Sequence, residues 1–239
     1  IHIIPSLEMG GAETSLSKLA SSKLRPRDNI FVLITFLGKG PIYKKLEKKS
    51  IRNLELIHLD FKNKFFKSFI YIIKQLCSNQ TKSITCWMYY SCLITILPVI
   101  ISRIFKQDNL IVSWNIRHTP GLISQEKKSL TFFIYFLIIF SFLPDFFIYN
   151  SLSAKLWHQK LYGNSSKSYV IYNFYNEETD INLEDKELPI DLSLDKYPTF
   201  GVLARLHPMK GHKELIYSLN ILKKKGVKFN LVLAGRNIL

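Results

Sequence analysis

Residues 199–211 read TFGVLARLHPMKG, and this stretch decides how the last part of the chain, residues 197–239, is organised. Residues 200–204 are an apolar run typical of a strand, and a short loop with Arg205 and Lys210 leads to a helix that opens near Gly211. Backbone N–H groups and the positive end of a helix dipole attract an anion, to which Arg adds a planar fork and Lys a point charge. The pattern predicts a diphosphate site, although both cations are also consistent with ordinary surface residues of a basic chain.

A resemblance to a known family rests on five motifs in order. GVLARLHPMKGHKELIYSLNILKKKGVKFNLVLAG, residues 201–235, resembles the opening of the C-terminal domain of glycosyltransferase family 4, the retaining GT-B enzymes. HIIPSLEMGGAETSLSKLA, residues 2–20, resembles the first strand, Gly-Gly loop and helix of that family. Between them WNIRHT (114–119), YNSLSA (149–154) and VIYNFYN (170–176) occur in the same order as in the family.

The fold class that the resemblance implies is α/β of the GT-B type, with two Rossmann-like domains. An N-terminal, acceptor-side domain with a doubly wound parallel sheet is expected in residues 1–176, and the start of an incomplete nucleotide-sugar-binding domain in 197–239. Residues 177–196 are acidic and broken by Pro189, which is typical of a linker. Apolar runs alternate with helical patterns, which independently indicates a parallel sheet. Strands are expected at 1–4, 30–36, 54–59, 83–88, 110–114, 146–149, 169–172, 200–204 and 229–234, and helices at 12–22, from 41, 65–76, 91–105, 130–143, 153–161 and 211–225.

The activity that the resemblance implies is transfer of a sugar, with retention of configuration, from a nucleoside-diphosphate sugar to a polysaccharide or lipid-linked glycan. Synthesis of cell-surface polysaccharide, including lipopolysaccharide, is the expected setting, without a cofactor or metal. Arg205 and Lys210 are expected to be catalytic, because preorganised cations stabilise the charge that develops on a departing diphosphate. The family's pair of Glu residues, seven apart, lies beyond residue 239, so we expect the 239 residues alone to be an inactive fragment.

The loop after the first strand contains Gly10 and Gly11, and the helix after it carries Glu13 in its first turn. Glycines allow close approach of backbone N–H groups to a ligand, and a carboxylate is favoured near a helix N-terminus. From the residues alone a simple tight turn is an equal alternative. The resemblance implies that all three residues contact substrate, where the cleft meets the acceptor and the donor phosphates.

A second polar group follows the strand at 110–114. Asn115, Arg117 and His118 are expected at its carboxyl end, where ligands gather in open α/β sheets. The resemblance implies that either Arg117 or His118 lies near the transferred sugar and the phosphate; we favour His118 as catalytic, and a loop His bonded to backbone is the alternative. Asn173 matches a substrate-binding Asn of the family, although Phe174 replaces the Gly that often follows it.

The composition favours anionic partners. The chain has 33 Lys and Arg against 18 Asp and Glu, a formal net charge of +15 and a pI near 9.6. No nucleic-acid motif accompanies this charge, so a sugar nucleotide and an anionic membrane surface rank above nucleic acid. The first loop lacks the G-x-G-x-x-G spacing of dinucleotide-dependent dehydrogenases. Three cysteines without metal-ligand spacing, Cys77, Cys86 and Cys92, indicate buried, reduced thiols of a cytoplasmic protein.

The most apolar stretch is LTFFIYFLIIFSFL, residues 130–143. As a helix it would measure about 21 Å, short of the roughly 30 Å of a bilayer core. We therefore predict a buried helix that ends at Pro144. This helix, or the Lys- and Phe-rich segment 61–74, is also a candidate for contact with a leaflet at the inner face of the membrane. A noncatalytic, membrane-surface binding protein is the alternative function.

Overall fold

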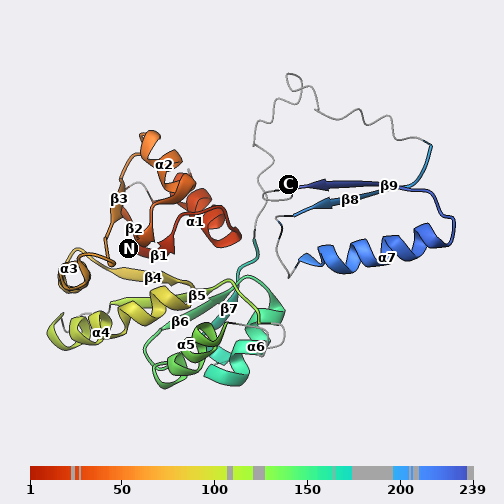
Figure 1. Ribbon diagram of the computed structural model, residues 1–239. Coiled ribbons are helices and arrows are strands. Elements are labelled where there is room, and N and C mark those ends of the chain that lie inside the picture. Colours follow the sequence, from red (N-terminus) through yellow and green to blue (C-terminus); the bar gives the residue numbers. More distant parts are fainter. Residues whose placement is uncertain are drawn as a thin grey trace. The chain divides into compact units, whose positions relative to one another are not determined.

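The computed structural model describes residues 1–22, 25–26, 28–106, 110–120, 127–163, 165–173, 196–204, 206 and 210–235. The chain divides into two compact units, Ile1–Asn176 and Glu177–Leu239. Each unit is described on its own below. Figure 1 labels the elements of both units.

The first unit is built on a sheet of seven parallel strands in the order β3-β2-β1-β4-β5-β6-β7 (Figure 1). From β1 the chain steps outward to β2 and β3, returns to pair β4 with β1, and then steps outward on the other side. Such a reversal of strand order opens a crevice at the carboxyl ends of the two strands concerned. The strands are β1 (His2–Ser6), β2 (Phe31–Gly38), β3 (Leu54–His58), β4 (Ser83–Trp87), β5 (Ile111–Ile116), β6 (Phe146–Tyr149) and β7 (Ser168–Val170).

Helices cover the sheet on opposite faces, because right-handed crossovers change face where the strand order reverses. α1 and α2 lie on one face and α3 to α6 on the other (Figure 1). The two faces have separate cores: Ile4 and Leu33 pack with α1 and α2, whereas Ile3 and Ile34 pack with the other layer. The helices are α1 (Gly11–Ser21), α2 (Gly40–Lys48), α3 (Phe65–Cys77), α4 (Met88–Lys106), α5 (Lys128–Ile139) and α6 (Leu152–Tyr162).

The second unit contains one βαβ motif. β8 (Thr199–Leu203) pairs in parallel with β9 (Asn230–Ala234), and α7 (His212–Lys224) connects them. Gly211 caps α7 with a φ of +68°, a left-handed conformation that glycine adopts without strain. The apolar side of α7 carries Leu215, Leu219 and Leu222 at helical spacing; Leu219 is buried and the other two are half-buried.

The strand and helix pattern expected from the sequence is confirmed, with three corrections. α5 ends at Ile139 and not at Pro144, because the N–H groups of Phe140, Ser141 and Leu143 turn to carbonyls three residues back. Asn115 is buried within β5 and is not in the loop after it. The helical spacing of Leu19 with Leu16 predicts that both face the sheet, but Leu19 is 37% exposed because it borders an open pocket at the amino ends of the strands.

The cysteines are free thiols, as expected from their spacing. Cys86 and Cys92 are fully buried, whereas Cys77 is only half-buried, which corrects the expectation that all three are buried. Burial raises the pKa of the Cys86 thiol to about 12, so this group stays protonated at neutral pH.

Leu16 and Leu19 provide a matched test of this packing within one helix. Leu16 is fully buried against Ile4 and Leu33, so we expect Leu16→Ala to lower the free energy of unfolding by about 2–5 kcal/mol. Leu19→Ala removes the same atoms from a partly exposed position and should cost less than about 1 kcal/mol. Urea denaturation of both variants measures the difference, and equal losses would contradict the described orientation of α1.

Candidate functional site

The candidate site lies at the carboxyl edge of the first sheet, beside the reversal of strand order between β1 and β4. Backbone hydrogen bonds anchor the loop after β1: the Leu7 N–H donates to the Lys39 carbonyl at 3.2 Å, and the Ile42 N–H donates to the Leu7 carbonyl at 3.0 Å. Gly40 permits this approach, because its φ is +76° and a Cβ there would lie 2.4 Å from the Leu7 carbonyl oxygen. The start of α2 thus holds the loop that leads into α1.

The backbone conformation does not require glycine at positions 10 and 11. Gly10 is the N-cap residue of α1 with an extended conformation, φ −149° and ψ 170°, which any residue adopts. A Cβ on Gly11 would meet no protein atom within 4 Å. The N-cap residue makes no side-chain hydrogen bond to this helix end, and the N–H groups of the first turn have no acceptor within the helix. This is the local geometry at which an anion binds to a helix N-terminus.

Glu13 is turned back toward the cap. A Cβ on Gly10 would lie 2.3 Å from Glu13 Oε2, so the carboxylate lies against the backbone of Gly10. This is the region in which the helix dipole favours a negative charge. Glu13 is not among the residues that line the adjacent pocket.

Arg117 follows β5 and reaches the helix that begins at this loop. Its Nη1 donates hydrogen bonds to Ser15 Oγ, at 3.0 Å, and to Asn173 Oδ1. Its Nε donates to Asn115 Oδ1 at 3.2 Å. The guanidinium carbon lies 5.0 Å from the centroid of the Trp87 ring, a cation–π distance. Side chains from α1, β4, β5 and the segment after β7 therefore meet around one guanidinium group.

The charge of this guanidinium is not neutralised by the protein groups described. Arg117 is half-buried, and desolvation lowers the pKa of its guanidinium, which nevertheless stays protonated because an Arg pKa starts above 12. Arg117 takes part in neither of the ion pairs Lys39–Glu47 and Arg103–Asp145. The hydrogen bonds of Arg117 to Asn115, Ser15 and Asn173 all go to neutral oxygens. A half-buried cation with only neutral partners favours a bound anion.

A pocket of about 400 Å³ opens beside this cluster. Four of its residues lie on one side of α1 at helical spacing, and Asn173 joins them from the segment after β7. Lys18 places a second cation at its wall. The lining residues are Met9, Gly10, Gly11, Thr14, Ser15, Lys18 and Asn173.

Ser15, Thr14 and Lys18 were missed from the sequence. A signal for them existed, because residues 11, 14, 15 and 18 repeat at the i, i+3, i+4, i+7 spacing of one helix face. The helical spacing of Ala12, Leu16, Leu19 and Ala20 predicted only the side of the helix that faces the sheet, and the side with these residues was left unassigned. Trp87 carried no signal, since its contact with Arg117 depends on the pairing of β4 with β5.

His118 lies in a different environment from Arg117. Its ring is edge-on to that of Tyr89, with 6.1 Å between the centroids. The Tyr89 hydroxyl is 2.7 Å from His158 Nε2, and His158 Nδ1 is 2.7 Å from the Ala154 carbonyl oxygen. A carbonyl only accepts, so Nδ1 carries the hydrogen and Tyr89 donates to Nε2. Tyr89 and His158 thus form a buried hydrogen-bonded pair, and His118 packs on this pair through the Tyr89 ring.

In the second unit, Lys210 is exposed immediately before Gly211, the cap of α7. Arg205 lies outside the described residues. His212, in the first turn of α7, is buried, and neither ring nitrogen has a hydrogen-bond partner among the residues described. The helix N-terminus predicted near Gly211 is present, and Lys210 directly precedes it.

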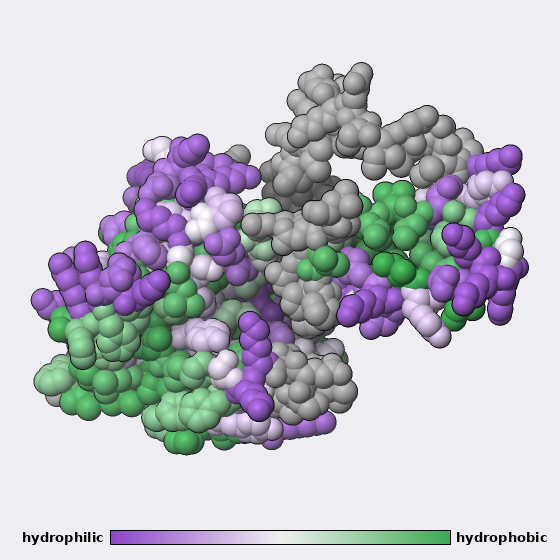
Figure 2. Space-filling view, viewed as in Figure 1, coloured by the Kyte–Doolittle hydropathy of each residue, from purple (hydrophilic) through white to green (hydrophobic). Residues whose placement is uncertain are grey.

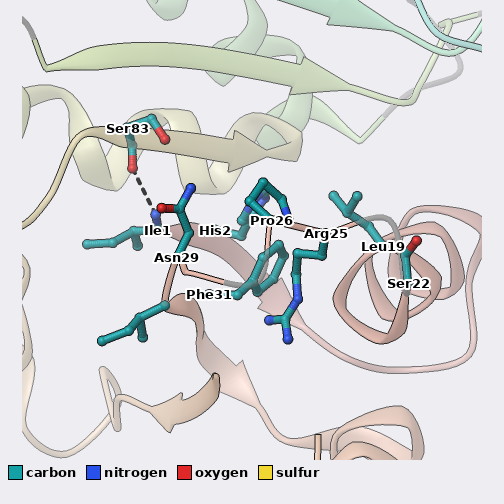
Figure 3. A pocket seen from close by; sticks show the side chains of 10 residues that line it. Ile1, His2, Leu19, Ser22, Arg25, Pro26, Asn29, Phe31 and Ser83 are labelled. Carbon is teal, nitrogen blue, oxygen red and sulfur yellow. Dashed lines mark hydrogen bonds between the residues drawn. The ribbon is translucent and has the colours of Figure 1, made fainter. Parts of the chain in front are cut away.

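A larger pocket, about 580 Å³, lies at the opposite edge of the first sheet (Figure 3). Figure 3 shows Ile1, whose amino group donates to the Ser83 carbonyl at 2.8 Å, and the rings of His2 and Phe31, stacked at 4.3 Å. This edge holds the amino ends of the strands, where ligands of open α/β sheets do not gather. Within the described part of the chain, no group of three or more metal-ligating side chains occurs here or elsewhere.

Comparison with known proteins supports the fold. No protein-family model and no curated protein matches the sequence. Three solved structures of Alr3699/HepE from Anabaena are similar: one in complex with UDP and glucose (TM-score 0.66, 18% identity), one with UDP (0.66, 15%) and one with UDP-glucose (0.61, 14%). The matches cover 98%, 99% and 98% of this chain and 61%, 69% and 68% of those chains. The predicted GT-B fold class is confirmed.

The buried His158 gives a pH-dependent stability. Desolvation lowers its pKa from the ordinary 6.5 to about 4, so the folded protein keeps it neutral where the unfolded chain binds a proton. Stability is therefore fully present above pH 6.5 and falls as the pH drops toward 4, by up to about 3 kcal/mol. His158→Phe should be less stable at neutral pH and should lose part of this slope.

Urea denaturation of both proteins at several pH values measures the effect. His2 and the terminal amine, whose pKa values are also lowered by desolvation, contribute to both proteins and cancel in the difference. Identical slopes for the two proteins would show that His158 is not held neutral.

Proposed function

We propose that the protein is a retaining glycosyltransferase of family 4 that moves a hexosyl unit from a nucleoside-diphosphate sugar to a glycan or lipid-linked acceptor. The setting we propose is cell-surface polysaccharide synthesis in the cytoplasm. The motifs in order along the sequence support the family, and the GT-B fold agrees with it. The chain spans 61% to 69% of the similar chains, so the proposal concerns the complete protein.

The observation that carries the proposal is the half-buried Arg117 guanidinium beside an uncapped helix N-terminus. A diphosphate satisfies both features, since its oxygens accept from a guanidinium fork and from backbone N–H groups. The pocket at this helix end is lined by Ser15 and Asn173, the two partners of Arg117, and a side chain at Gly11 would take up part of its space. The Anabaena structures were obtained with UDP, glucose and UDP-glucose, which agrees with a ligand of this chemistry.

In the proposed reaction the bond between the sugar C1 and the diphosphate oxygen breaks, and the acceptor oxygen bonds to C1 on the same face. The proton of the acceptor hydroxyl passes to the departing diphosphate oxygen. Negative charge grows on the departing diphosphate, so fixed donors directed at it lower the barrier. We assign this role to Lys210 and Arg205 in the second unit. We assign His118, whose ring packs edge-on against that of Tyr89, to contact with the transferred sugar.

In the first unit, the amides of Gly10 and Gly11 are assigned to the phosphates together with Arg117. Asn173 holds the guanidinium through its Oδ1 and presents its amide to the same pocket. Glu13 is assigned to a hydroxyl of the substrate at the mouth of the loop. The proposal requires no cofactor or metal, because cations and backbone donors meet the negative charge.

Arg117→Ala tests the central assignment. In the complete protein, with UDP-glucose as the first donor to be tried, we expect kcat/KM to fall about 100-fold or more, as when one preorganised donor is removed. Arg25→Ala is the matched control, since Arg25 lies on the pocket at the opposite edge of the sheet. Normal turnover in Arg117→Ala, measured by release of the nucleoside diphosphate, would overturn the assignment.

Gly11→Ala separates ligand approach from folding. A methyl group at Gly11 meets no protein atom, so thermal unfolding should change by less than about 1 kcal/mol. The same methyl occupies the space over the N-terminus of α1, and we expect the Kd for UDP to rise about 10-fold or more in calorimetric titration. Unchanged affinity would show that the phosphates do not approach this helix end.

A further inference from the structure

One face of the first unit is apolar on its outside as well as its inside. α3, α4 and α5 pack side by side over the sheet. If this layer met only water, the residues on its outer side would be expected to be polar. On α4, Tyr90, Leu97 and Ile104 are exposed at intervals of seven residues, the spacing of one helix face. Figure 2 shows hydrophobic residues gathered over α4 and α5. We call this surface the α3–α5 face.

The neighbouring helices extend the same surface. Phe66 and Ile70 of α3 are 79% and 51% exposed, and Phe132 and Ile139 of α5 are 62% and 65% exposed. A groove of about 360 Å³ runs among the three helices, and every residue that lines it is apolar. Contiguous exposed apolar surface of this kind marks a site of protein or membrane interaction.

The charged residues within α3, α4 and α5 have one sign. α3, α4 and α5 contain no Asp or Glu in their sequences. Exposed lysines stand at the start of α3 and of α5, and both helices begin at the carboxyl edge of the sheet, the edge with the candidate site. Of the nearby carboxylates, Asp145 pairs with Arg103 and Asp60 bonds to Asn63. The lysines are Lys62, Lys64, Lys67, Lys127 and Lys128.

α4 alone could suggest a membrane span, because Met88–Phe105 is long and apolar enough by length and composition. However, 44% of that window is buried, and the helix packs on β1, β4 and β5. Its inner side belongs to the sheet, which leaves only its outer side for lipid. This arrangement is that of a surface lying on a leaflet and not of a helix crossing it.

We propose that the α3–α5 face docks on an anionic lipid leaflet, with apolar side chains inserted and the lysines against the headgroups. The charge pattern selects this partner: a second copy would oppose lysine to lysine, whereas anionic headgroups complement the cations. Docking would hold the carboxyl edge of the sheet, and with it the candidate site around Arg117, beside the membrane. The docking surface does not depend on the transfer reaction.

Vesicle co-sedimentation tests the proposal, with phosphatidylcholine vesicles and with vesicles that also contain phosphatidylglycerol. We expect binding to the anionic vesicles and its loss at high salt, since screening weakens headgroup attraction. Replacement of Lys62, Lys64 and Lys67 by Gln should weaken binding roughly 100-fold, at about 5-fold for each cation near the surface. A variant combining Phe66→Ser, Ile70→Ser and Leu97→Ser should weaken it at least about 10-fold.

The matched control removes the same charge from the opposite face. Lys44, Lys45 and Lys48 are exposed on α2, whose buried side belongs to the other core, so their replacement by Gln should leave most of the binding intact. Thermal unfolding of each variant shows that it is folded, and Arg117→Ala should bind vesicles normally, which separates docking from catalysis.

Three results would overturn the proposal. Equal losses in the α2 control and in the Lys62, Lys64 and Lys67 variant would indicate attraction by net charge alone. Absence of vesicle binding by the folded protein would exclude a lipid partner. Dimerisation abolished by the apolar substitutions, without vesicle binding, would assign the α3–α5 face to a second copy of the chain.

Discussion

The strand order of the first sheet reverses between β1 and β4, and most other features of the unit follow from that reversal. Connections in one direction place α1 and α2 on one face, and connections in the other direction place α3 to α6 on the opposite face. The loop after β1 and the residues after β5 therefore approach each other at the carboxyl edge. Gly40 allows the start of α2 to pack against the loop after β1, and Arg117 bridges from the end of β5 to Ser15 of α1.

The site that results is defined by an imbalance of charge. Arg117 donates hydrogen bonds to Ser15, Asn173 and Asn115, all neutral, and its guanidinium carbon lies over the Trp87 ring. These contacts orient the guanidinium without neutralising it, and α1 adds uncapped N–H donors nearby. Orientation without neutralisation prepares a group for an anionic ligand, because no internal partner must be displaced first.

The two helical layers also differ in what their outer sides meet. The outer side of α2 carries lysines and Glu47, as expected of a surface in water. The outer sides of α4 and α5 carry exposed aromatic and aliphatic residues, and an apolar groove runs among α3, α4 and α5. The same sheet thus presents one solvated face and one face suited to a lipid surface, while the candidate site lies at the edge that both layers share.

The sequence by itself determined the order of strands and helices, because alternating apolar runs and helical periodicity are local properties. It also identified the Gly10–Gly11 loop, the polar segment after β5, and the cation beside Gly211. Only the tertiary structure decided which of these residues meet: Arg117 joins Ser15 and Asn173, 102 and 56 residues away, whereas the neighbouring His118 packs against Tyr89. Adjacent residues in a loop point in different directions, and strand pairing brings distant segments together, so neither outcome is encoded in spacing along the chain.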